Sequence, residues 1–178
     1  MNYTDYFQKA LSYENYVSML GENYTLHQLH YSKFSITPDT QSVLNEFKPL
    51  KILVITEPWC GDSLAVLPVI RRISEQIKGS ELRILLRDQH LEIMKRFLSN
   101  GSQAIPKFLF LNPGGDLLFH WGSRPRPAQQ IFEDHREAMK QGTIAKGEVL
   151  KKIRNYYSRD KGQEIIKEIV DLIRTKYS

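Results

Sequence analysis

The sequence contains a single cysteine, Cys60, among its 178 residues. One thiol excludes an internal disulfide and any all-cysteine metal site built by one chain. No run of about 18 apolar residues occurs, so no membrane-spanning helix is expected. The first residues have neither the basic start nor the apolar stretch of a secretory signal, which predicts a cytoplasmic protein. Any chemistry at Cys60 must proceed without a second cysteine of the same chain.

Internal repeats, low-complexity tracts and Gly/Ser-rich linkers are also missing. A chain with 41% hydrophobic residues at this length can bury one core, which predicts a single domain over residues 1–178. Within it we expect a helical N-terminal extension over residues 1–49, an α/β core over residues 50–140 and a helical C-terminal extension over residues 141–178.

The net charge of +5 is unevenly distributed along the chain. Residues 1–50 hold three basic and five acidic side chains, whereas residues 140–178 hold ten basic and five acidic ones. Over residues 161–174 the charges alternate in sign around an apolar stripe of helical period, which predicts a solvated helix face. We therefore expect neither a nucleic acid nor a membrane as partner.

The N-terminal extension has the apolar spacing of helices. Residues 3–20 predict a helix that ends at Gly21 and is interrupted near Ser12. Thr37 is placed to cap a second helix, with Pro38 in its first turn.

Aromatic and imidazole side chains are concentrated in the same extension. Six of the nine tyrosines fall within the first 31 residues, and we expect them to seal the helices onto the domain. His27 and His30 are three positions apart without a carboxylate or thiol at ligand spacing. They are predicted to lie on the surface rather than in a metal site.

From residue 51 the pattern alternates between strand and helix. Residues 51–56 are short, apolar and β-branched, as in a strand covered on both faces. Asp88 is predicted to cap a short helix that continues to residue 97. The expected order is strand 51–56, a helix ending before Gly79, strand 82–86, the short helix, and a hairpin of strands 107–111 and 117–121, followed by a helix.

Four landmarks in this region occur in a consistent register. They are the segment Trp59-Cys60-Gly61-Asp62-Ser63 between a strand and a helix, Pro68 within that helix, Ala104-Ile105-Pro106 before a strand, and Gly122 sixteen positions after Pro106. Over residues 50–140 this set resembles the thioredoxin-like family. The resemblance implies an α/β thioredoxin-like fold, in which a central mixed β-sheet is flanked by helices, with helical extensions at both ends.

The resemblance also implies a site. Cys60 would be the nucleophile at the start of a helix, where unpaired N–H groups and the helix dipole favour the thiolate and lower its pKa. The loop of Ile105 and Pro106, with a cis bond, would face it and pair through its backbone with an extended peptide. The other predicted groove residues are Trp59, Gly61, Asp62, Trp121 and Gly122.

Ser63 departs from the family pattern. In members with two cysteines, the second cysteine attacks the mixed disulfide formed by the first and releases the product. Ser63 cannot perform this step, although its hydroxyl can donate a hydrogen bond to the Cys60 thiolate. The prediction is monothiol exchange, in which an external thiol releases the product.

Two further departures concern charge. Val54 is apolar where many thioredoxins have a buried acid, so Glu57 and Asp62 are left as carboxylates that either relay protons or raise the pKa of Cys60 against the helix dipole. The sequence does not decide the net direction of that pKa. Lys107 follows the proline of the loop, and it either pairs with Asp62, attracts an anion or is simply solvated.

Two arginines follow the groove glycine. Arg124 and Arg126 either grip the carboxylates of a small thiol such as glutathione or begin a helix from an exposed loop.

The function predicted from these residues is that of a cytoplasmic monothiol disulfide oxidoreductase without cofactor or metal. Cys60 and Ser63 would carry the chemistry, and the partners would be protein or low-molecular-weight thiols and disulfides. The alternative is a redox-silent binding module, as in a chaperone or adaptor. An iron–sulfur site shared by two chains ranks last, because Trp59 precedes the cysteine and Gly114-Gly115 falls in the hairpin.

Overall fold

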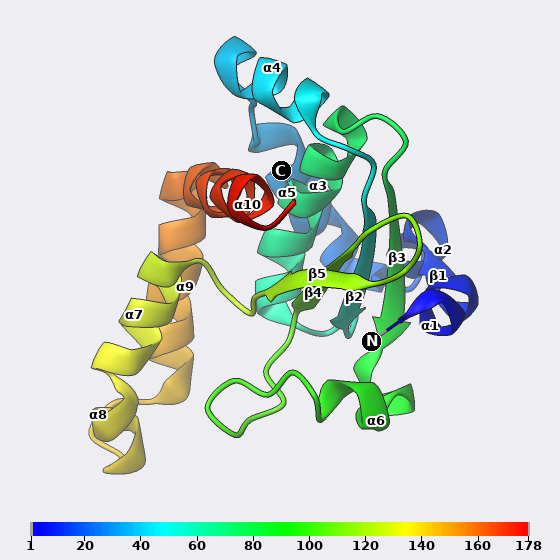
Figure 1. The fold of residues 1–178 in the computed structure, drawn as a ribbon. Coiled ribbons are helices and arrows are strands. Elements are labelled where there is room, and N and C mark those ends of the chain that lie inside the picture. Colours follow the sequence, from blue (N-terminus) through cyan, green and yellow to red (C-terminus); the bar gives the residue numbers. More distant parts are fainter. Residues whose placement is uncertain (1, 178) are drawn as a thin grey trace.

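The computed structural model describes residues 2–177 and contains a five-stranded mixed sheet with the strand order β1-β3-β2-β4-β5 (Figure 1). The strands are β1 (Leu11–Ser12), β2 (Lys51–Thr56), β3 (Glu81–Leu86), β4 (Lys107–Leu111) and β5 (Leu117–Trp121). The helices are α1 (Thr4–Lys9), α2 (Tyr13–Val17), α3 (Tyr24–Lys33), α4 (Pro38–Glu46), α5 (Gly61–Gln76), α6 (Leu91–Met94), α7 (Arg126–Asp134), α8 (Arg136–Lys140), α9 (Lys146–Asp160) and α10 (Gln163–Lys176), with 3-10 turns at Gly21–Asn23 and Arg87–Gln89.

Strand β2 is the centre of the sheet. It pairs in parallel with β3 and antiparallel with β4, and all of its residues after Lys51 are buried. Alternate side chains enter two separate cores, with Ile52 and Val54 on one face and Leu53 and Ile55 on the other. The first core contains residues of α2, α4, α5, α9 and α10, and the second contains residues of α1 and α6. This α/β arrangement confirms the predicted fold class.

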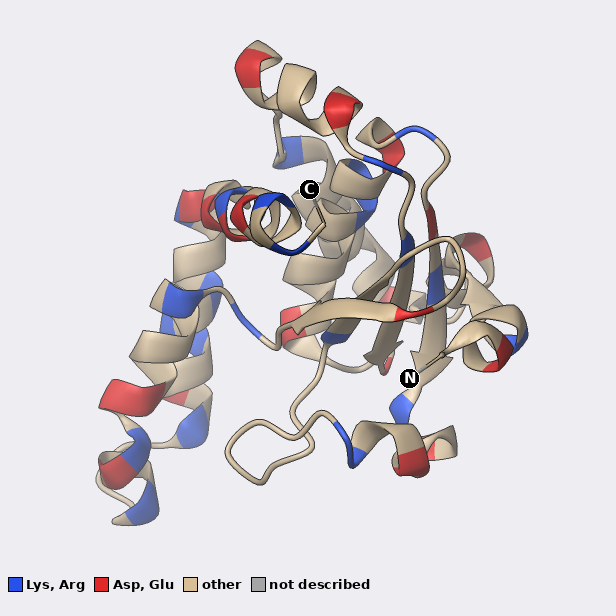
Figure 2. Ribbon diagram, in the orientation of Figure 1, with Lys and Arg blue, Asp and Glu red and all other residues tan. Residues whose placement is uncertain are grey.

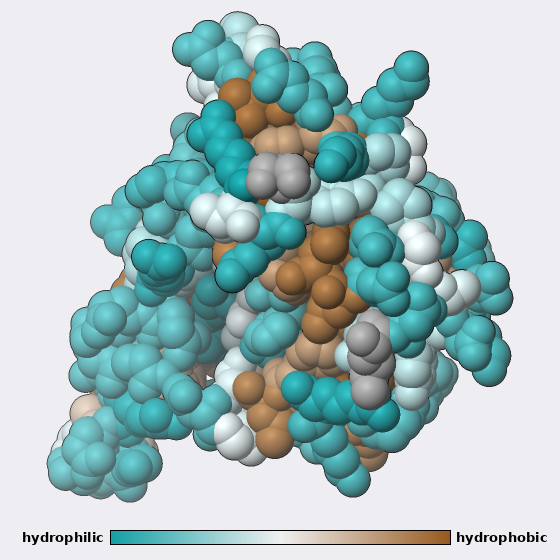
Figure 3. All heavy atoms as spheres, viewed as in Figure 1, coloured by the Kyte–Doolittle hydropathy of each residue, from teal (hydrophilic) through white to brown (hydrophobic). Residues whose placement is uncertain are grey.

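Strand β5 forms one edge of the sheet. Leu117 and Leu118 on this strand are only half-buried. An apolar band runs through the middle of the face seen in Figure 3, over β5 and the region near α6, between hydrophilic surfaces. None of the helices in the described part of the chain has the length and hydrophobicity needed to cross a membrane.

The N-terminal extension is broken near Ser12, as predicted, but the break contains a strand. Leu11 and Ser12 pair antiparallel with β3, and the Ser12 hydroxyl accepts a hydrogen bond of 3.1 Å from the Asn15 N–H at the start of α2. The second helix ends at Val17, so Gly21 lies beyond its end and begins a 3-10 turn. Two residues are too short a run to show a strand period in the sequence.

The predicted helix capped by Asp88 is wrong in its boundaries. Asp88 lies inside a 3-10 turn, and α6 begins at Leu91 and ends at Met94. The carboxylate of Asp88 pairs with Arg87 at 2.8 Å instead of capping, while the Asp88 N–H donates to Glu57 Oε1 at 2.8 Å.

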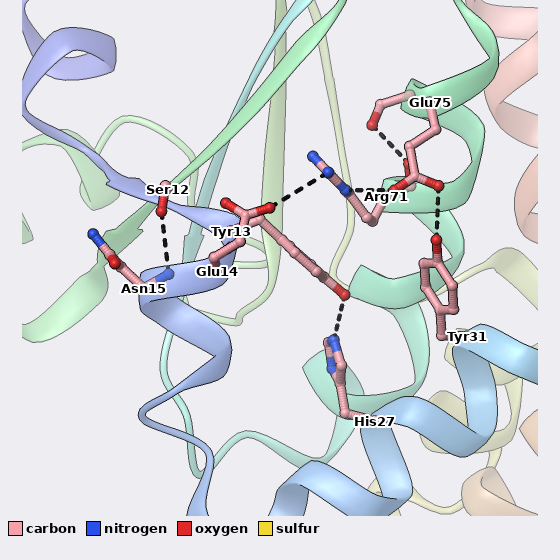
Figure 4. Close-up of polar contacts among 9 residues, drawn as sticks. Ser12, Tyr13, Glu14, Asn15, His27, Tyr31, Arg71 and Glu75 are labelled. Atoms are coloured by element: carbon pink, nitrogen blue, oxygen red, sulfur yellow. Dashed lines mark hydrogen bonds and ion pairs between the residues drawn. The ribbon is translucent and has the colours of Figure 1, made fainter.

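The prediction of a surface position for His27 is also wrong. His27 is fully buried under α2, and its Nε2 lies 2.6 Å from the hydroxyl of Tyr13 (Figure 4). Arg71 of α5 stacks over the Tyr13 ring at 4.8 Å. Tyr3, Tyr13 and Tyr16 are buried as well, which agrees with tyrosines sealing the N-terminal helices onto the domain, whereas Tyr24 is exposed and does not. Burial, followed by the charge of His30, lowers the pKa of His27 to about 4.

This burial predicts a loss of stability in mild acid. Unfolded His27, with a pKa near 6.5, binds a proton before the folded protein does, so the free energy of unfolding falls as the pH drops from about 6.5 to about 4. Below about pH 4 the loss is complete, and His27 then lowers the free energy of unfolding by about 3 kcal/mol. His27→Gln, which cannot titrate, should lack this component when urea unfolding is compared at pH 7, 5.5 and 4.5.

His90→Gln is the matched control, because it leaves the Tyr13–His27 pair intact, and it should keep the pH dependence of the wild type. Equal pH slopes for His27→Gln and the wild type would contradict the assignment of this loss to His27.

Candidate functional site

Cys60 occupies the N-cap position of α5, directly after the loop that follows β2. Its side chain is 7% exposed, and the Sγ–H donates to the backbone oxygen of Ile105 at 3.5 Å. The Ile105–Pro106 peptide bond is cis. Residues that are 45 positions apart in the sequence thus meet at the sulfur atom, on the side of the sheet that carries the second core.

A cavity of about 460 Å³ opens beside this contact. Five of the predicted site residues line it, namely Trp59, Cys60, Gly61, Asp62 and Ile105. Trp59 is 59% exposed, and the guanidinium of Arg87 lies 5.1 Å from the centre of its ring. An exposed indole beside a thiol is placed to stack on a bound molecule.

Trp121 is not a wall of this cavity, in contrast to the prediction. It is buried with its ring centre 5.7 Å from that of Phe108, and its indole N–H donates to Glu168 of α10 at 2.7 Å. Glu168 also accepts from the Arg126 N–H at 2.8 Å. Trp121 and Arg126 therefore attach β5 and the start of α7 to α10.

Gly122 and Pro106 belong to the support of the site rather than to the cavity wall. Gly122 has a φ of +112°, and a Cβ at this position would overlap the backbone oxygen of Pro106. Only glycine lets the two loops pack so closely. The predicted juxtaposition of these loops is therefore present, although neither residue lines the cavity.

The helix end and the nearby carboxylates act on the pKa of Cys60 in opposite directions, so the sequence leaves its net direction open; in the structure the pKa is raised. Burial raises the pKa of the thiol, and this effect outweighs the hydroxyl and N–H of Ser63, which lower it; the charge of Asp62 raises it further. The hydrogen bond to Ile105 also favours the neutral thiol, because a carbonyl oxygen accepts only from S–H. Ser63 is itself buried, and its hydroxyl bonds to that of Thr56.

Asp62 is engaged on both of its carboxylate oxygens. Oδ2 pairs with Arg124 at 2.7 Å, and Oδ1 accepts from the hydroxyl of Tyr157 at 2.8 Å. Arg124 also stacks on Phe132 at 4.7 Å. Burial, followed by the Asp62 charge, raises the pKa of Tyr157 well above its ordinary value. Asp62 thus has no contact with Lys107, and Arg124 serves the protein's own carboxylate rather than a ligand.

Lys107 is buried rather than solvated. Its ammonium donates to the Ser99 hydroxyl at 2.6 Å and to the Gly122 carbonyl at 2.9 Å. Burial lowers its pKa. Lys107 therefore holds the loop before β4 against the loop after β5.

Glu57 is committed to structure too. It is buried, its carboxylate accepts from the Asp88 N–H, and its carbonyl accepts from the Tyr16 hydroxyl at 3.2 Å. Val54 lies in the first core. Across residues 2–177, no group of three His, Cys, Asp or Glu side chains is arranged to hold a metal ion.

A sequence model described as thioredoxin matches residues 10–140, which is most of the chain. The chain belongs to the thioredoxin family. Two solved structures share its fold and cover nearly all of it. A protein of unknown function from Pseudomonas aeruginosa has a TM-score of 0.76 and 17% identity over 98% of both chains, and an HIV epitope-scaffold has 0.75 and 16% over 98% of this chain and 99% of the scaffold. A search of curated proteins gave no match.

This thioredoxin-family chain has a cavity wall that motif reasoning missed. Lys146, Leu150, Ile153, Arg154 and Tyr157 of α9 line the cavity, beyond the end of the family match. Their spacing places them on one helix face, which was the available signal. The sequence alone does not reveal what α9 packs against.

Proposed function

We propose that this protein is a monothiol exchange enzyme that forms mixed disulfides through Cys60. The observation that carries the proposal is the position of the sulfur, which lies at the wall of an open cavity and 3.5 Å from the Ile105 carbonyl beside a cis proline. Membership of the thioredoxin family supports a redox role at this position.

The exchange requires a deprotonated sulfur. The Cys60 thiolate attacks one sulfur of a bound disulfide, so that one S–S bond forms while the original one breaks, and the departing thiolate takes up a proton. The hydroxyl of Ser63 and the N–H groups at the start of α5 stabilise the thiolate. Ser63 cannot resolve the product. In this proposal a small thiol of the cytoplasm, the compartment that the sequence predicts, attacks the mixed disulfide and restores Cys60.

The raised pKa of Cys60 predicts an alkaline reaction profile. Incubation with bis(2-hydroxyethyl) disulfide should add one half-disulfide to the intact mass, at a rate that keeps rising up to pH 9, because burial holds the sulfur in its thiol form at neutral pH. Iodoacetamide alkylation should follow the same curve.

Cys60→Ser should abolish both reactions, since the chain has no other cysteine. A rate that levels off below pH 8 would contradict the raised pKa. The absence of any adduct at pH 9 would overturn the proposed exchange.

The burial and raised pKa of Cys60 favour one other function, a binding module without exchange chemistry. In that case the folded protein would give no adduct at pH 9, whereas the protein unfolded in urea would react. The comparison separates a sulfur that the fold presents to substrate from one that the fold protects.

A further inference from the structure

We propose that the cavity beside Cys60 is a binding site for small disulfides that carry carboxylates, held by the cationic face of α9. This inference rests on the proposed exchange function and adds its substrate class. The site combines a thiol, a stacking surface and positive charge within about 460 Å³, a volume that suits a small molecule.

The charge of the cavity wall is strongly positive. Its basic side chains are Arg87, Arg124, Arg136, Lys146 and Arg154, and its acidic side chains are Asp62 and Glu133. Basic residues are visible along α9 in Figure 2.

Both acids of the wall are already neutralised. Asp62 pairs with Arg124 at 2.7 Å, and Glu133 pairs with Arg136 at 3.1 Å. Lys146 and Arg154 remain without an ion-pair partner among residues 2–177. Their charges are available to an anionic ligand.

The two free cations stand two helical turns apart on the same face of α9. Leu150 and Ile153 lie between them and also line the cavity, so this wall is apolar in the middle and cationic at its ends. Trp59 and Cys60 form another part of the wall. A peptide-like disulfide with terminal carboxylates matches this distribution, with its carboxylates at Lys146 and Arg154 and its sulfur atoms at Cys60.

The reaction at the bound ligand conserves atoms and electrons. Cys60 gives up its proton and is oxidised to the mixed disulfide with one half of the ligand, while the other half leaves as a thiolate, is reduced and takes up a proton. The disulfide ligand is itself the oxidant.

The test compares an anionic and a neutral disulfide at pH 9 and low ionic strength. The rate of adduct formation is measured with oxidised glutathione and with bis(2-hydroxyethyl) disulfide, and the ratio of the two rates is the readout. In the double variant Lys146→Gln/Arg154→Gln this ratio should fall about tenfold, because two attractive charges are removed. High salt should reduce the wild-type ratio in the same direction.

The matched control is Lys151→Gln/Arg159→Gln. It makes the same change in charge on α9, but at positions that do not line the cavity, and it should keep the wild-type ratio.

Binding without chemistry is measured separately with S-methylglutathione, which has the same carboxylates but cannot exchange. It should change the fluorescence of the exposed Trp59, and its dissociation constant should rise about tenfold in Lys146→Gln/Arg154→Gln. Exchange with an unchanged ratio would overturn the anionic site and leave the proposed function standing. Charge-dependent binding without any adduct would overturn the proposed exchange and leave the anionic site standing. If neither an adduct nor charge-dependent binding is seen, both proposals are overturned.

Discussion

Asp62→Ala is expected to lower the free energy of unfolding by about 3 kcal/mol, the lower end of the cost of breaking a buried ion pair by removing one partner, because the two side chains are largely rather than completely buried. Arg124 would keep its charge in a largely buried position, and the Tyr157 hydroxyl would lose its acceptor. Urea unfolding of the variant and the wild type at pH 7 measures the difference.

Asp88→Ala provides the matched control for this loss. Asp88 also pairs with an arginine at 2.8 Å, close to the 2.7 Å of the Asp62 pair, but its carboxylate is well exposed to solvent. The control should cost less than about 1 kcal/mol. Equal losses for the two variants would contradict the role given to burial.

Asp62→Ala should also change the reactivity of Cys60. The charge of Asp62 raises the pKa of Cys60, so Asp62→Ala should shift the alkylation profile toward lower pH. The profile is measured in the concentration range of denaturant where the variant remains folded. An unshifted or upward-shifted profile would show that Asp62 does not act on the thiol through its charge.

Gly122→Ala is expected to cost about 3 kcal/mol or more and to slow exchange at Cys60. The φ of +112° is unfavourable for any side chain, and the new Cβ would meet the Pro106 carbonyl and push the cis-proline loop away. Unfolding in urea and the rate of adduct formation with bis(2-hydroxyethyl) disulfide are the two measurements.

Gly142→Ala separates the two causes of this loss. Gly142 also has a positive φ, of 72°, but a Cβ there meets no atom within 4 Å. Its substitution should cost only about 1 kcal/mol and leave the exchange rate unchanged. A loss for Gly122→Ala no larger than that of the control would show that the loops separate without strain.

The parts of the fold that the sequence predicted are those with a local signal. A short local pattern predicts each of these elements: a β-branched run for β2, an apolar stripe for α5, and turn residues between β4 and β5. The pairing of Cys60 with Ile105 was predictable only because the family resemblance supplied a contact between distant segments.

The errors concern side chains whose environment is set by distant segments. Lys107 and His27 are polar residues, and polar residues are expected at the surface. Both are buried by distant elements, which the sequence around each residue does not reveal. Trp121 points toward α10, where its indole N–H donates a hydrogen bond to Glu168. The direction of the Cys60 pKa could not be predicted at all, because it depends on burial, which competes with the helix dipole and is not a property of the motif.

The hydrogen bond from Tyr157 to Asp62 joins the C-terminal extension to the residue two positions after the sulfur. Detaching α9 would leave the Asp62 charge less shielded beside Cys60 and would remove the cationic wall at the same moment. On the proposed function, the C-terminal extension would therefore act on the acidity of Cys60 and on the attraction of an anionic ligand together, although it does not carry the thiol.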